Sequence, residues 1–184
     1  MFFALLFKRL FLVDNTQTYL YLPNSVLYMD DFLVLKQQAI REVRLADHML
    51  TMTYPLLKDP KLLLAILENL FLASSHAMSA LLSFERAWKR IPAFQDTFES
   101  KFHIFKQKVV PRYQIDMKWL RFIAELKEAL EDHRQASTEF SRKGMFVMAN
   151  EEYRLRTLSV DDLKYYLRLT KDFVHYVLQL IRTG

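Results

Sequence analysis

The chain has 184 residues, of which 52% are hydrophobic and 26% are charged, and this balance excludes a disordered chain. Its two glycines and five prolines leave few positions for tight turns, which favours a mainly α fold over an all-β one. Because it has no cysteine, disulfides, a thiolate nucleophile and Cys-based zinc sites are excluded, and we expect a cytoplasmic protein.

The formal net charge is +5, and the excess lies in the middle of the chain. Residues 86–143 contain thirteen Lys or Arg against eight Asp or Glu, so the remainder is neutral. Either this is a solvated helix face, or it is a surface that faces phosphates. In the second case the candidate nucleic-acid-binding residues are Lys101, Lys106, Lys108, Arg112, Lys118 and Arg121.

Residues 1–30 are predicted to form an N-terminal apolar segment and a connection. The apolar run at residues 1–13 contains Lys8 and Arg9, is too short to span a bilayer, and precedes no small-residue cleavage site. We expect it to pack on the core or on a partner chain rather than on a membrane surface, and we predict no integral membrane span. Residues 20–29 are predicted to form a connection, with a short strand on either side of it.

Residues 31–184 are predicted to form a single helical-bundle domain. The first long helix begins at Asp31, and its inward stripe is Phe32, Leu35, Ala39, Val43, Ala46 and Leu50. Pro55 is predicted to end this helix. Asp59 then caps the next one, with Pro60 in its first turn.

The second helix is apolar almost all round, so we expect it to be the central helix. Small residues fill its second half, at 73–80, and predict a helix crossing or a subunit interface. His76 lies in this stretch. We interpret it as a satisfied structural residue, with a catalytic or ligand-binding role as the alternative.

Two further helices are expected after Pro92. The first carries a phenylalanine stripe, Phe94, Phe98, Phe102 and Phe105, interpreted as core rather than as a base-stacking platform, and ends at residues 109–111. The second runs over residues 114–133. Its inward residues are Ile115, Trp119, Ile123, Leu126 and Leu130.

A small β-hairpin is predicted before the last helix. Residues 134–143 are polar and are expected to form a loop, whereas 145–148 and 152–157 read as two strands around Asn150. Ser159 and Asp162 resemble a capping box. The last helix then carries the stripe Leu163, Leu167, Thr170, Val174, Val177 and Ile181, which gives about five helices in all.

Several kinds of site are excluded by the sequence. Neither glycine opens a strand-to-helix turn, so a phosphate-binding glycine loop is ruled out. The histidines form no close pair at metal-ligand spacing, and the adjacent carboxylates at 151–152 and 161–162 diverge on a helix. We therefore expect no metal and no cofactor.

Two helices each place an Arg and a His two turns apart on one face. The pairs are Arg41 with His48 and Arg168 with His175. In a groove, such an Arg can hold a scissile phosphate while the His moves a proton of a ribose hydroxyl. Arg168 and His175 are the candidate catalytic residues of a metal-free ribonuclease.

Over residues 31–182 the chain resembles HEPN domains, the higher eukaryote and prokaryote nucleotide-binding group. The resemblance is carried by the two helical hairpins, the small residues around His76, and the segment from Arg168 to His175. It implies a homodimeric helical bundle and, in active members, metal-independent RNA cleavage by the Arg and His. Leu169 stands where active members usually carry a polar residue such as Asn, so a degenerate, non-cleaving HEPN domain is the companion expectation.

Three functions follow as hypotheses. The first is an RNA-associated or protein-interaction module, with a homodimer, RNA or another protein as partner. The second is a HEPN-type ribonuclease that uses Arg168 and His175. The third is a nucleic-acid-binding protein without chemistry, which would use the basic residues of the 86–143 region.

Overall fold

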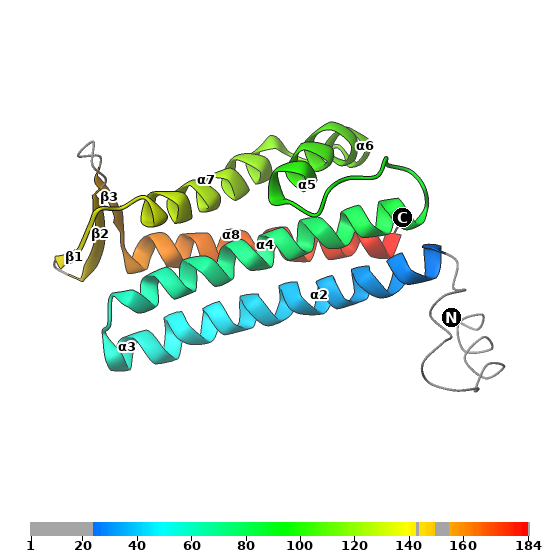
Figure 1. Ribbon diagram of the computed structural model, residues 1–184. Coiled ribbons are helices and arrows are strands. Elements are labelled where there is room, and N and C mark those ends of the chain that lie inside the picture. Colours follow the sequence, from blue (N-terminus) through cyan, green and yellow to red (C-terminus); the bar gives the residue numbers. More distant parts are fainter. Residues whose placement is uncertain (1–23, 143, 150–154, 184) are drawn as a thin grey trace, which may run out of the picture.

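The computed structural model describes residues 24–142, 144–149 and 155–183. The elements are α2 (Asn24–His48), η2 (Met49–Thr53), α3 (Tyr54–Leu57), α4 (Lys61–Ala87), α5 (Phe98–Ile104), η3 (Phe105–Val109), α6 (Val110–Tyr113), α7 (Met117–Arg134), β1 (Thr138–Arg142), β2 (Met145–Ala149), β3 (Leu155–Leu158) and α8 (Val160–Thr183). Five principal helices form a bundle with a small sheet at one end (Figure 1). The predicted fold class is confirmed. The apolar run at residues 1–13 lies outside the described residues.

Helix α4 is the central helix, and it packs against α2, α7 and α8. Its small-residue stretch, 73–80, lies in these contacts. Ala73 and Ala77 have no exposed surface, which shows that neighbouring helices approach closely here. The buried Ser74 hydroxyl donates to the carbonyl of Leu70 at 3.0 Å, so it does not lack a partner.

The inward stripes predicted for the last two long helices reach the same core. Their buried members are Trp119, Ile123, Leu126, Leu130, Leu163, Leu167, Thr170, Val174 and Val177. Phe173 joins the helices, since its ring centroid lies 5.5 Å from that of Trp119 and 6.5 Å from that of Phe105. These aromatic contacts connect α8 to both α7 and η3.

The first long helix is longer at both ends than the sequence predicts. Its backbone is helical from Asn24, so residues 24–29 are part of α2 and not a connection flanked by strands. Pro55 does not end it either. The chain passes through the π-helical turn η2 into α3, and it ends only at Lys58, which is left-handed with φ 50°. A π turn widens the helix before the proline, which relieves the clash between the ring and the preceding turn.

Pro111 repeats this arrangement, so the predicted helix end at residues 109–111 is wrong. The π-helical turn η3 precedes α6, and the helix ends at Gln114, which is also left-handed with φ 50°. Its start is also later than predicted. Phe98 begins α5 after the N-cap Thr97, whose hydroxyl accepts from the Ser100 amide at 3.3 Å.

The phenylalanine stripe is only in part a core stripe. Phe94 lies before α5, and of the three remaining rings only Phe105 is fully buried. Phe98 and Phe102 are half-buried, and their rings stack with centroids 5.5 Å apart. They pack on the outside of the core, which gives the short helix α5 its contact with the bundle.

Asp side chains start two helices. The Lys61 amide donates to Asp59 Oδ1 at 2.9 Å, as predicted, and Pro60 needs no hydrogen bond in this first turn. The Lys118 amide likewise donates to Asp116 Oδ1 at 2.8 Å, so α7 begins at Met117, a little later than predicted.

The predicted capping box of the last helix is confirmed. The Asp162 amide donates to Ser159 Oγ at 3.2 Å, and the Ser159 amide donates to Asp162 Oδ2 at 2.9 Å. The two residues thus satisfy one amide each at the start of α8. Asp replaces the usual Glu or Gln here without loss of either bond.

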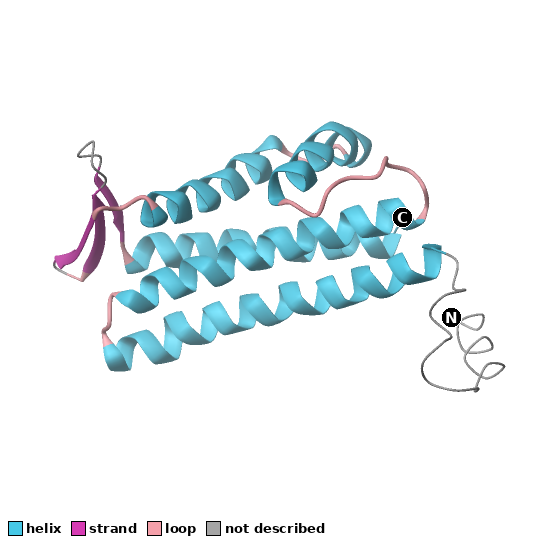
Figure 2. Cartoon of the chain, viewed as in Figure 1, coloured by secondary structure: helices cyan, strands magenta, loops and turns pink. Residues whose placement is uncertain are grey.

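The sheet has three antiparallel strands in the order β1-β2-β3, gathered beyond the ends of α7 and α8 (Figure 2). The predicted hairpin corresponds to β2 and β3, in which Phe146 lies opposite Leu158. Strand β1 was expected to be a loop because its residues are polar. It pairs with the free edge of β2 through backbone hydrogen bonds, which need no apolar side chains. Arg156 on β3 ties the sheet to α7 by an ion pair of 2.7 Å with Asp132.

Candidate functional site

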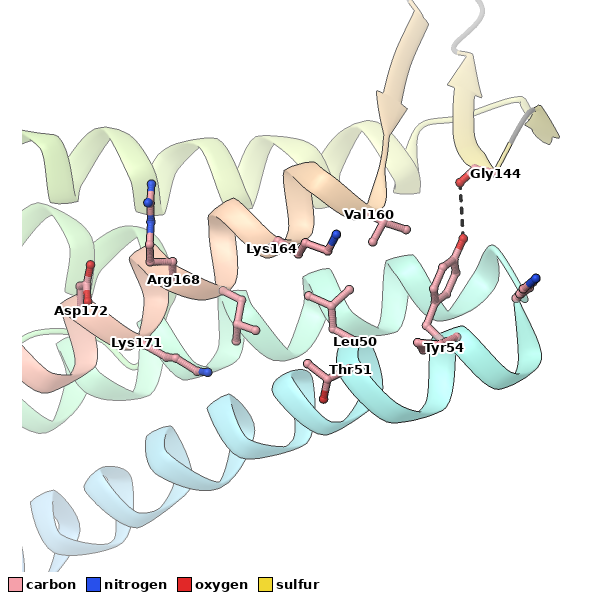
Figure 3. Close-up of a pocket in the computed structure, with 12 residues that line it drawn as sticks. Leu50, Thr51, Tyr54, Gly144, Val160, Lys164, Arg168, Lys171 and Asp172 are labelled. Atoms are coloured by element: carbon pink, nitrogen blue, oxygen red, sulfur yellow. Dashed lines mark hydrogen bonds between the residues drawn. The ribbon is translucent and has the colours of Figure 1, made fainter.

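An open cavity of about 800 Å³ lies where the end of the first long helix meets the start of α8 and the β1–β2 turn (Figure 3). Apolar side chains and four cations line it, together with a single carboxylate. The lining residues are Leu50, Thr51, Tyr54, Pro55, Lys58, Gly144, Val160, Lys164, Leu167, Arg168, Lys171 and Asp172. We refer to it as the basic cavity.

Local sequence explains why these elements meet here. The π turn and Pro55 carry the helix one further turn, and the left-handed Lys58 then turns the chain back into α4. Gly144, with φ 75°, makes the tight turn that brings the sheet to the opposite rim. The Tyr54 hydroxyl donates to the Gly144 carbonyl at 3.5 Å, a long contact between the two rims.

Two lysines of the basic cavity form only weak, surface-exposed ion pairs. Lys171 Nζ lies 2.9 Å from Asp47 Oδ2, and Lys164 Nζ lies 2.9 Å from Asp161 Oδ1, with both pairs at the surface. Exposed pairs of this kind contribute at most about 1 kcal/mol, so a phosphate can replace the carboxylates. Lys58 is exposed, and it forms no ion pair with any residue in the described part of the chain.

Arg168 lines the basic cavity, but its guanidinium points away from Leu50 and Thr51 (Figure 3). It lies over the ring of Tyr165, 5.5 Å from the ring centroid. This contact is on the exposed side of α8.

The predicted catalytic pair lies on one face of α8 but not in one cavity. Arg168 and His175 are both exposed. Among the described residues that line the basic cavity, Arg168 is present and His175 is not. His175 Nε2 instead lies 2.8 Å from Gln179 Nε2, toward the far end of the helix. The other pair, Arg41 and His48, is also exposed on α2.

Three of the six predicted nucleic-acid-binding residues are engaged elsewhere. Arg112 Nε lies 3.4 Å from the buried Glu85, and Lys101 pairs with Asp96. Lys118 lies 3.7 Å from Asp116 and stacks on Trp119, with Nζ 4.8 Å from the ring centroid. Their positive charge is thus partly neutralised by the protein itself.

The other three, Lys106, Lys108 and Arg121, are exposed. Within the residues that the structure describes, no ion pair of theirs is found. Lys106 borders a shallow groove on α5 and α7 that also contains Glu128 and Glu131. The excess charge of the 86–143 region is therefore interspersed with carboxylates and does not form one continuous basic surface there.

A buried carboxylate, Glu85, was not among the residues predicted from the sequence. Its side chain has no exposed surface, the Tyr113 hydroxyl donates to Oε1 at 2.7 Å, and Arg90 Nη1 donates to the same oxygen at 3.2 Å. Arg112 approaches Oε2 as an ion pair, without the angle of a hydrogen bond. The burial of Glu85 could have been predicted from helical spacing, because it follows Leu81 and Leu82 by four and three residues on the buried face of α4.

Glu85 and its partners Arg90, Arg112 and Tyr113 have a structural role. They connect the end of α4 to α6, which lies more than twenty residues further along the chain. Burial and the bond to Glu85 raise the pKa of Tyr113 to about 12, so the phenol stays a donor at neutral pH.

His76 departs from the satisfied structural residue that the sequence suggests. It is half-buried, and its Nδ1 is buried without a hydrogen-bond partner among the residues the structure describes. It lies in a second cavity, away from the basic one. Among the described residues, no group of three or more His, Asp or Glu is placed so that it could hold a metal ion.

Only one helix of the described chain, α4, is long and apolar enough to cross a membrane, by length and composition alone. Half of the residues in its most apolar stretch are buried inside the bundle. This is consistent with the prediction of no integral membrane span. No protein-family model, curated protein or solved structure matches the chain.

Proposed function

We propose that this chain is a cytoplasmic, RNA-associated helical-bundle module that binds RNA at the basic cavity. The observation that supports this most is the set of four cations, Lys58, Lys164, Arg168 and Lys171, around an apolar floor. RNA affinity comes largely from Lys and Arg near phosphates, and this is the pattern that such a cavity offers.

The cavity also suits one splayed base of a single strand. Single-stranded RNA is recognised by stacking of its bases on aromatic side chains and by contacts with its phosphates. Tyr54 supplies an aromatic ring, and Leu50 and Leu167 supply an apolar floor. Lys58 and Lys164 lie on opposite rims, from α3 and α8, where phosphates on either side of the base can reach them.

The test is RNA affinity against salt, measured by fluorescence anisotropy with single-stranded RNA, duplex RNA and duplex DNA. In the double variant Lys58→Gln/Lys164→Gln, we expect weaker binding and a salt slope smaller by about 1.4, or about 0.7 for each phosphate that is no longer neutralised. The matched control, Lys106→Gln/Lys108→Gln, removes the same charge from a different surface.

Equal affinity of the wild type and Lys58→Gln/Lys164→Gln, with weaker binding by the control instead, would move the RNA site to the 86–143 region. Equal binding to all three nucleic acids would favour a general nucleic-acid-binding protein without RNA preference. If the chain binds none of the three nucleic acids at low salt, RNA binding is excluded and the protein-interaction module becomes the favoured function.

A metal-independent HEPN-type ribonuclease is the second candidate. It is supported by the accessibility of both Arg168 and His175 on one face of α8, although only Arg168 lines the basic cavity. Cleavage of RNA in the presence of a chelator, abolished in both Arg168→Ala and His175→Ala but retained in His103→Ala, is the expected signature. If the chain binds RNA and leaves it intact, the degenerate HEPN-like form is favoured.

A further inference from the structure

Tyr165 on α8 presents an exposed aromatic ring beside the basic cavity. The residue is 49% exposed, and the guanidinium of Arg168 lies over its ring, 5.5 Å from the centroid. Contacts between a cation and an aromatic ring occur at five positions in the described chain, and of these five cations Arg168 is the one that lines the basic cavity. The ring is therefore joined to the cavity through a residue that belongs to both.

The Tyr165 ring is held in place on two sides. Arg168 lies over it, and the ring of Tyr166 lies beside it, with the two centroids 5.9 Å apart. Tyr166 is itself fixed, because it is buried and its hydroxyl donates to Glu125 Oε1 at 2.5 Å. A ring that is already ordered loses little conformational freedom when a ligand stacks on it.

The charges around Tyr165 are balanced, unlike those on the far rim of the basic cavity. Residues 161–172 of α8 contain three Lys or Arg and three Asp. Across the cavity, Lys58 forms no ion pair with any residue in the described part of the chain. Charge alone therefore does not attract a phosphate to Tyr165. The position instead offers a flat aromatic ring and a flat guanidinium, which are the surfaces on which nucleobases stack.

The ring also lies where a strand bound in the basic cavity continues. Lys164 lines the cavity and directly precedes Tyr165. Arg168 follows one turn later, with its guanidinium on the side of α8 that faces away from Leu50 (Figure 3). A phosphate at Lys164 thus has the cavity on one side and the Tyr165–Arg168 pair on the other, so that neighbouring nucleotides can use both.

We propose that Tyr165 and Arg168 form a second base-binding position next to the basic cavity. One base of the strand enters the cavity, and the next base stacks on the Tyr165–Arg168 pair outside it. The ligand is therefore single-stranded RNA of two or more nucleotides, since bases within a duplex are not free to stack on protein side chains. This inference rests on the proposed function, because it extends the same RNA site.

The probe is a short single-stranded RNA, whose binding to the full chain is measured by fluorescence anisotropy. Versions of this RNA in which one base at a time is replaced by an abasic sugar are measured beside it. Tyr165→Leu removes the flat ring and keeps an apolar side chain of the helix. We expect it to weaken binding by at least about fivefold, as for the loss of one stacked base. The salt slope should not change, because no charge is removed.

Two controls separate stacking from other effects. Tyr165→Phe keeps the ring and should bind as the wild type does. Trp88→Leu removes an exposed ring that also lies under a guanidinium, since Trp88 is 59% exposed and Arg90 lies 5.6 Å from its centroid. Trp88 does not line the basic cavity, so this variant should keep the wild-type affinity.

The abasic strands identify the base that stacks. One abasic position should weaken binding to the wild type but should have no further effect on Tyr165→Leu, where the contact is already lost. Equal effects of every abasic position on both proteins would overturn the proposal.

If Tyr165→Leu binds as the wild type does while Lys58→Gln/Lys164→Gln binds more weakly, the stacking position is wrong and the RNA site stands. If the wild type binds no RNA, both fail together. A smaller salt slope in Tyr165→Leu would mean that the variant acts through the charge of Arg168, and an equal loss in Trp88→Leu would mean that exposed rings act without regard to the site. Either result also overturns the proposal.

Discussion

Glu85 illustrates how a single residue is fixed by its surroundings. A carboxylate with no exposed surface is tolerated only where donors and cations surround it. Here the hydroxyl of Tyr113 and the guanidiniums of Arg90 and Arg112 do so. Arg112, which the sequence places on a nucleic-acid surface, is thereby used to hold two helix ends together.

Two tyrosines, Tyr113 and Tyr166, should titrate well above the ordinary pKa of a phenol. Burial and the bonds to Glu85 and Glu125 raise the pKa of Tyr113 and Tyr166 to about 12 each. Since these phenols lose their protons near pH 10 when unfolded, the folded state loses stability as the pH rises from about 10 through 12. Phenolate absorbance against pH, with urea unfolding at several pH values, measures both effects.

The Glu85→Gln variant is the control for this assignment. It should lower the pKa of Tyr113, because the charged acceptor is removed, and should leave Tyr166 unchanged. If all nine tyrosines of the chain titrate together near pH 10, these two bonds do not persist in solution.

At the scale of one residue, the sequence identifies candidates but not their partners. It correctly places Arg168 and His175 on one helix face, because that follows from the helical repeat alone. It does not reveal that Lys101 pairs with Asp96, or that His76 Nδ1 has no partner among the described residues. Those facts depend on which segments meet in the folded chain.

At the scale of elements, the first helix of each helical hairpin ends in the same way. Each has a π-helical turn, then a proline in the following turn, then a left-handed residue: Lys58 after Pro55, and Gln114 after Pro111. The bulge, the proline and the reversal together form one device for turning a helix sharply toward its neighbour.

The left-handed position of Gln114 predicts a stabilising substitution. Residues with a Cβ are disfavoured at this C-cap position, whereas glycine adopts it freely. Gln114→Gly should therefore raise the free energy of unfolding by about 0.5–1 kcal/mol in urea titrations. The same change at an ordinary helical position, Glu128→Gly in α7, should instead lower it by about 1 kcal/mol. Destabilisation by both variants would indicate that Gln114 is not left-handed in solution.

The elements themselves were largely predictable, but their ends were not. The apolar stripes of α2, α4, α7 and α8 follow from their three-and-four spacing, and the caps at Asp59 and Ser159 from their side chains. Pro55 and Pro111 misled the prediction, since a π turn accommodates a proline that would break a regular helix. Strand β1 was missed because its pairing uses the backbone and leaves no apolar pattern.

At the scale of the whole molecule, an exposed apolar patch is where we propose that the homodimer implied by the HEPN resemblance forms. Met52, Leu56 and Leu57 on η2 and α3 are 58%, 82% and 66% exposed, beside the basic cavity. Clustered exposed apolar residues mark interaction surfaces. A two-fold contact here would place two basic cavities near each other, so that one RNA strand could reach both.

The dimer can be tested by light scattering after size exclusion. We expect Leu56→Glu/Leu57→Glu to convert a dimer into a monomer, because two charges would face their copies across the contact. The control Leu155→Glu, at a leucine of the sheet that is 69% exposed, should remain dimeric. A wild-type chain that stays monomeric at high concentration would exclude the homodimer.

The place of α8 in the bundle also bears on how the protein is made. It follows every other described element along the chain, yet it packs on α4 and is bridged to α2 by the Lys171–Asp47 pair. Chains are synthesised from the N-terminus, so the apolar face of α4 that awaits α8 stays uncovered until the ribosome has finished residues up to Val177. We therefore expect this uncovered face of α4 to be the most aggregation-prone surface of the described chain while α8 is still being synthesised.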